Sequence, residues 1–138
     1  MKTHLLSSGA FLVLERGDEV LATLGRFVAD RGWKACTFSG IGALRDVEVG
    51  FFDITQRTYD RRTFPEVELL SLTGNASRLE DGSVAIHLHA VLGTEAFGAV
   101  GGHLFSGIVS VTAEINATAL EADLVRRVDP VSGLKLLG

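Results

Sequence analysis

The chain has 138 residues, a formal net charge of −4 and a hydrophobic fraction of 46%. This length is ordinary for one domain with its own core, and we expect a single domain over residues 1–138. An acidic chain offers no electrostatic basis for binding nucleic acid. The single cysteine, Cys36, excludes an internal disulfide and predicts a buried thiol in a reducing compartment.

Neither a signal peptide nor a membrane span is predicted. Residues 1–10 lack a long apolar core and a small-residue cleavage site, and no apolar run approaches the length of a span. We therefore expect a cytoplasmic protein. The high hydrophobic fraction for so small a chain indicates that part of the surface is covered in an oligomer.

The first elements in chain order are a short strand over 11–14 and a helix over about 18–31. Asp18 is the predicted N-cap, with Glu19 in the first turn, and Gly32 ends the helix. The apolar residues that recur at helical spacing are Val20, Leu21, Leu24, Phe27 and Val28.

After the helix the hydrophobic period changes to two, which is typical of strands. The predicted strands cover 34–39, 47–52, 58–64, 67–73, 83–92, 97–105, 109–116 and 120–128. Pro65 is expected to end one of them, and residues 129–138 are expected to be poorly ordered. Short strands joined by brief turns predict an α+β fold with a mainly antiparallel sheet or sandwich and one principal helix.

The strand over 83–92 has two different faces. Leu88 and its neighbours two residues apart are all apolar, and this face is expected to pack on the core. The opposite face carries His87 and His89 among small or apolar residues such as Ala85 and Val91. Such a face suits a subunit interface or the lining of a pocket.

Three of the four histidines, His87, His89 and His103, lie close together in the sequence. His87 and His89 point to the same side of their strand, and a turn over 93–98 brings His103 back to about the level of His87. Three converging imidazoles predict a divalent metal site with one open position, suited to zinc, copper, nickel or iron. The alternative is that each histidine is structural and hydrogen-bonded to a backbone carbonyl. If they do hold a metal, their other ring nitrogens should contact carbonyls or a carboxylate.

Several segments, in this order and spacing, resemble the PPC (plants and prokaryotes conserved) domain. They are Gly40-Ile41-Gly42-Ala43, Val49-Gly50-Phe51-Phe52-Asp53, residues 68–75, His87-Leu88-His89-Ala90 and Gly101-Gly102-His103-Leu104. The resemblance covers nearly the whole chain, to about Val128. It implies a largely antiparallel sheet of about seven strands with a packed helix, a homotrimer, and a metal, usually zinc, on the residues matching His87, His89 and His103.

In plant members this domain follows an AT-hook, a basic element that enters the minor groove, and many bacterial relatives are described as DNA-binding proteins for that reason. This chain has no Arg-Gly-Arg-Pro element. Its basic runs, Arg57 with Arg61-Arg62 and Arg126-Arg127, are interrupted or bracketed by aspartates, as in a solvated face or an interface. We therefore expect no direct DNA binding.

Three functions stay open at this point. The first is a homotrimeric module whose three histidines hold a divalent metal and whose open site binds a small anionic ligand or regulates assembly. The second is a zinc-dependent enzyme that uses metal-bound water, for which Glu68 or Glu114 would be the candidate base. The third is a DNA-associated regulator that acts through a partner. The first is the preferred interpretation.

Overall fold

Eight strands and one helix make up the fold, in a computed structural model that describes residues 1–138. The strands are β1 (Lys2–Leu6), β2 (Gly9–Glu15), β3 (Ala35–Asp53), β4 (Thr58–Leu79), β5 (Val84–Gly93), β6 (Ala99–Leu120), β7 (Val125–Val128) and β8 (Lys135–Leu137). Helix α1 spans Val20–Asp30. The predicted α+β class is confirmed, with eight strands instead of about seven. No helix is long and apolar enough to cross a membrane.

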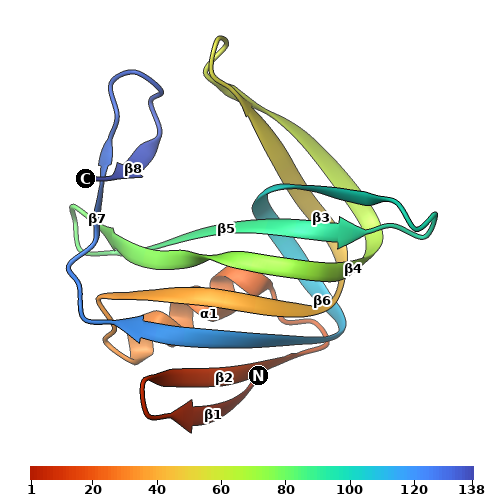
Figure 1. The fold of residues 1–138 in the computed structure, drawn as a ribbon, viewed down its shortest axis with the longest axis horizontal. Coiled ribbons are helices and arrows are strands. Elements are labelled where there is room, and N and C mark those ends of the chain that lie inside the picture. The colour runs from red at the N-terminus through yellow and green to blue at the C-terminus, as the bar shows by residue number, and fades with distance from the viewer.

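The strands form one sheet in the order β1-β2-β6-β3-β4-β7-β8, and β5 pairs with both β4 and β6. Every pairing is antiparallel except the short one between β4 and β7. Because β5 is bonded along both edges, β3, β4, β5 and β6 close into a ring. Figure 1 shows the far end of the β3–β4 hairpin and the β7–β8 hairpin projecting from the same side of this body.

Three long strands replace pairs of predicted short ones, and the first of them, β3, joins the predicted strands over 34–39 and 47–52. Pro65 does not end its strand, because β4 runs from Thr58 to Leu79 without a break. Pro65 lacks a backbone N–H, and the residue opposite it, Asp46, makes no pair and has a φ of 51°. The hydrogen bond that Pro65 cannot donate is therefore missing from the β3–β4 pairing at a point where β3 is already irregular. The predicted strands over 97–105 and 109–116 are likewise one strand, β6.

The N-cap of helix α1 is Glu19, one residue after the predicted cap. The carboxylate of Glu19 accepts the Ala22 N–H at 2.6 Å and caps the helix. The predicted cap, Asp18, is wrong, because its carboxylate accepts the Glu15 N–H at 2.9 Å instead. Gly32 ends the helix as predicted: it adopts a φ of 64°, and its N–H donates to the Ala29 carbonyl.

The core lies between α1 and the inner face of the sheet. The predicted apolar face of β5 is confirmed, since Leu88, Ala90 and Leu92 are all buried there with the α1 stripe. Cys36 is fully buried, and burial raises the pKa of its thiol to about 11, which makes it an inert core residue. The outer face of β5 is left for His87 and His89.

Both ends of the chain are more regular than the sequence indicates. Residues 2–6 form β1, which pairs with β2. Residues 129–138, expected to be poorly ordered, form a turn and strand β8, which pairs with β7. In this turn the Asp129 carboxylate accepts the Ser132 N–H at 2.7 Å and the Ser132 hydroxyl at 2.6 Å, which lowers the pKa of Asp129.

Candidate metal centre

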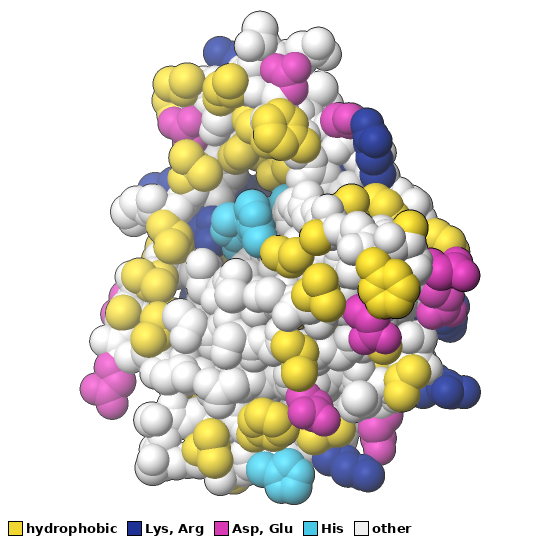
Figure 2. Space-filling model, turned by 45° about the vertical axis from the view of Figure 1, so that its right-hand side comes forward, with side chains coloured by type: hydrophobic (Ala, Val, Ile, Leu, Met, Phe, Trp, Pro, Cys, Tyr) yellow, Lys and Arg dark blue, Asp and Glu magenta, His cyan; other side chains and the backbone are white.

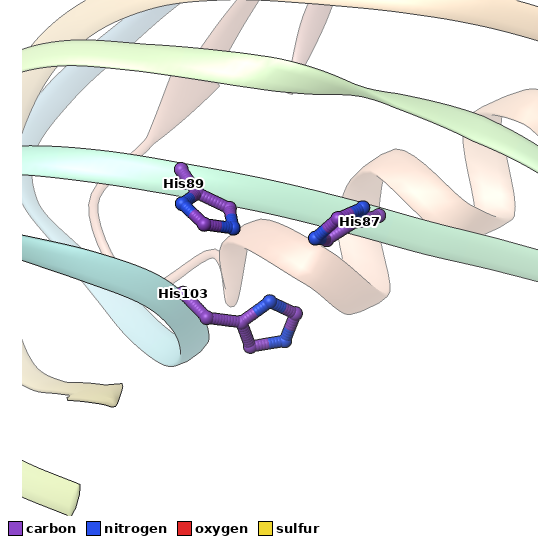
Figure 3. Close-up of side chains that lie close together, drawn as sticks. All are labelled: His87, His89 and His103. Atoms are coloured by element: carbon purple, nitrogen blue, oxygen red, sulfur yellow. The ribbon is translucent and has the colours of Figure 1, made fainter. Parts of the chain in front are cut away.

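The three predicted histidines come together on the outer face of the sheet, and their rings are turned toward one another (Figure 3). One ligand atom from each of His87, His89 and His103 lies within 4.8 Å of the others. The ring centroids are 5.1 to 5.6 Å apart. His103 pairs directly with His89, so it stands at the level of His89 and not, as expected, at that of His87.

The cluster lies beside a cavity of about 410 Å³. His87 and His103 are partly buried in its wall, whereas His89 is exposed. The other lining residues are Tyr59, Leu79, Ala85, Ile86, Arg126, Gly133, Leu134, Lys135 and Leu136. Figure 2 shows histidine side chains at the bottom of a hollow beneath the projecting part of the molecule, next to a basic side chain. The imidazoles are therefore open to a small molecule on one side.

Neither the Nδ1 atom of His87 nor that of His103 contacts the backbone carbonyl or carboxylate that was predicted for a ring nitrogen facing away from the metal. The Nδ1 atom of His87 lies 3.2 Å from Nη2 of Arg126, a cation, and not beside a carbonyl or carboxylate. The Nδ1 atom of His103 is buried and has no hydrogen-bond partner in the protein. A buried ring nitrogen without a partner fits a metal ligand, because a bound ion would occupy its lone pair.

The environment keeps two of the imidazoles neutral. Burial, followed by the charges of His87, His89, Arg61 and Arg126 in that order, lowers the pKa of His103 to about 4. Burial also lowers the pKa of His87, with Arg126 and then His89 as the next causes. Metal binding requires neutral imidazole, so this environment prepares the cluster for an ion.

The metal-free protein should lose stability as the pH falls from about 6.5 to about 4. His103 has its ordinary pKa of 6.5 when unfolded and about 4 when folded, so the unfolded chain binds more protons in this window. Urea denaturation at pH 7 and pH 5 measures the effect. The His103→Gln variant should show a smaller difference between the two pH values than the wild type, and an equal difference would contradict the assignment.

Arg126 is the residue of this site that the sequence analysis missed. Its side chain is not solvated, since the residue is only 8% exposed. It donates to the Ser77 hydroxyl at 3.0 Å, the Asn75 side-chain oxygen at 2.8 Å and the Lys135 carbonyl at 3.1 Å. No carboxylate forms an ion pair with it. Its neighbour Arg127 does fit the predicted solvated face and pairs with Glu80 at 3.4 Å.

The two carboxylates weighed as catalytic bases do not join the cluster. Glu68 and Glu114 are both exposed, and neither belongs to the group of residues that can share an ion. Neither forms an ion pair with Arg45, which pairs with Asp46. The histidine cluster therefore contains no acidic side chain.

Fold and site together define a class of protein: a domain with a closed antiparallel sheet, one covering helix and an outward-facing triad of histidines. Residues 5–121 match the family model of the Plants and Prokaryotes Conserved (PCC) domain, the family called PPC above. The chain belongs to this family. A search of curated proteins finds no match.

Solved structures of similar proteins agree with this membership. A "Putative DNA-binding protein" from Ralstonia eutropha JMP134 is 31% identical with a TM-score of 0.90, covering 99% of this chain and 95% of its own. A PPC protein from Pyrococcus horikoshii is 30% identical with a TM-score of 0.85, covering 100% and 97%. A metal-containing protein from Archaeoglobus fulgidus is 30% identical with a TM-score of 0.87, covering 99% of each chain.

Proposed function

We propose that this protein is a homotrimeric PPC-domain module that holds one divalent metal ion, preferably zinc, on His87, His89 and His103 and binds a small anionic ligand there. The observation that carries the proposal is the approach of three ligand atoms to within 4.8 Å beside an open cavity. The name of the Archaeoglobus fulgidus relative, a metal-containing protein, supports it. A bound ion would supply a Lewis-acidic position for the ligand.

Ligand binding is preferred to hydrolysis because no carboxylate lies in the cluster to act as a base. The chain's own groups suit holding an anion: the half-buried imidazoles give neutral ligands, and Arg126 gives a positive charge at the wall of the cavity. Tyr59 and Phe105 pack around His103, with ring centroids 5.3 and 4.7 Å from its own, and hold that ring in place.

Exposed apolar surface supports the trimer. On the histidine side of the sheet, Val91 is 44% exposed and pairs with the exposed Gly101, two residues along β6 from the exposed Ala99. Ile41, Leu70 and Val111, 57%, 51% and 63% exposed, line one shallow hollow on strands β3, β4 and β6. Burial of apolar surface gains about 25 cal/mol per Å². Covering these residues with neighbouring subunits would stabilise an assembly.

Size-exclusion chromatography with in-line light scattering, followed by elemental analysis of the peak, tests the proposal. The expected species has three times the chain mass of 14.7 kDa and one divalent ion per chain. Val111→Glu should shift the mass toward the monomer, whereas the control Leu6→Glu, on strand β1, should not. A metal-free monomer at micromolar concentration that takes up no zinc would contradict the proposal.

Binding to duplex DNA is expected to be no tighter than about 10⁻⁴ M at physiological salt, the weak end of non-specific binding. Two basic residues of the β3–β4 hairpin have acidic partners, since Arg61 lies 3.5 Å from Glu48 and Arg62 lies 3.7 Å from Asp60. Fluorescence anisotropy with a labelled duplex measures this affinity. Sub-micromolar, salt-sensitive binding would favour the DNA-associated function instead.

A further inference from the structure

The charge of Arg126 has no counter-ion in the protein. The residue is 8% exposed and lines the cavity with His87 and His103, and all its hydrogen-bond partners are neutral. A divalent ion on three neutral imidazoles would add two more positive charges beside it, since no carboxylate belongs to the cluster. A buried site with this much unbalanced positive charge favours a bound anion.

Metal binding would also remove one hydrogen-bond acceptor of Arg126, the Nδ1 atom of His87. A guanidinium has no acceptor, so His87 must accept at Nδ1 in the 3.2 Å contact with Nη2 of Arg126. A neutral imidazole has one lone-pair nitrogen, and a metal bound to either nitrogen of His87 takes that lone pair. The hydrogen bond from Arg126 to His87 is then lost, and one N–H of Nη2 is without an acceptor.

The available donors match one carboxylate. Arg126 has five N–H groups, and Ser77, Asn75 and the Lys135 carbonyl keep three of them occupied. Release from His87 leaves one N–H on Nη1 and one on Nη2, and the two oxygens of a carboxylate can accept from both. The cavity of about 410 Å³ is much larger than an inorganic anion, and 6 of its 11 lining residues are hydrophobic, among them Leu79, Ile86 and Leu134.

We propose that Arg126 anchors a short-chain organic carboxylate whose apolar body lies against the hydrophobic residues of the cavity, and that metal binding at His87 switches this site on by releasing the guanidinium. The proposal rests on the proposed metal-binding function. Because the two binding events are coupled, each should strengthen the other by the same factor.

Isothermal titration with butyrate tests the proposal, with butyramide as the neutral isostere and sulfate as the inorganic anion. Zinc-loaded wild type should bind butyrate about tenfold or more tighter than butyramide or sulfate, and about tenfold or more tighter than metal-free protein does. Arg126→Gln should weaken butyrate binding to the zinc-loaded protein by about tenfold or more. The matched control, Arg127→Gln, removes the same charge from the exposed neighbour and should leave the affinity within about twofold.

If Arg126→Gln does not fold, an NMR titration of the wild type tests the same proposal. The Nε–H resonance of Arg126 should shift when butyrate is added to zinc-loaded protein and should stay in place in metal-free protein. No shift, equal butyrate affinity in Arg126→Gln and wild type, or equal affinity for sulfate and butyrate would overturn this inference while the metal site stands. Failure of the wild type to bind zinc would overturn both.

Discussion

Replacing His89 by alanine is expected to abolish stoichiometric metal binding and to leave the protein folded. His89 is exposed on the outer face of β5, whereas Leu88 and Ala90 on either side of it point into the core. The substitution therefore removes a ligand without opening a cavity. Loss of one of three ligands should cost more affinity than the roughly 10- to 100-fold that loss of an outer partner costs.

Elemental analysis after mild dialysis measures this effect, with circular dichroism as the check on folding. The matched control is His4→Ala, because His4 is an exposed histidine on the edge strand β1, where it pairs with Phe11. The control should keep one ion per chain. A folded His89→Ala protein that retains stoichiometric metal would show that the three imidazoles are not the ligands.

Gly74→Ala should be strongly destabilising, by about 2–3 kcal/mol, the upper part of the range for overpacking. Gly74 lies in β4 opposite Leu88 of β5, next to the pair formed by Asn75 and His87. A Cβ atom there would lie 2.0 Å from the His87 carbonyl oxygen and 2.9 Å from the Leu88 Cα atom. Both are backbone atoms, so the two strands would have to separate, and zinc affinity should fall as His87 moves.

The control for this prediction is Gly25→Ala in helix α1. A Cβ atom at Gly25 meets only the Ile86 side chain, at 3.7 Å, so there is room for the methyl group. Alanine should stabilise the helix by about 0.5–1 kcal/mol. Urea denaturation of both variants gives the comparison, and a Gly74→Ala protein as stable as the wild type would contradict the described packing of β4 on β5.

The histidine cluster could be predicted from the sequence because its three residues lie on two consecutive strands joined by a short turn. Alternation along β5 puts His87 and His89 on one face, and the next strand returns through a short turn. The register of that return could not be predicted. It depends on the loop of residues 94–98, where Thr94 and Gly98 bond and Phe97 takes a φ of 58°, and this loop sets His103 opposite His89.

Arg126 could not be predicted because its position depends on contacts distant in sequence. It lies in a four-residue strand that pairs in parallel with the end of β4, next to Ser77 and Asn75 about fifty positions earlier. No short pattern in the sequence indicates such a pairing. The same applies to the continuity of β4 through Pro65, which depends on the irregular backbone of Asp46 on another strand.

The central claim is that His87, His89 and His103 hold a metal ion, and the most direct test is diffraction from crystals of zinc-loaded protein with anomalous data at the zinc edge. The predicted result is one strong anomalous peak per chain between the three rings, with zinc–nitrogen distances of about 2.0–2.1 Å. Crystals grown with zinc that show no peak there, and imidazoles hydrogen-bonded only to protein groups, would contradict the claim.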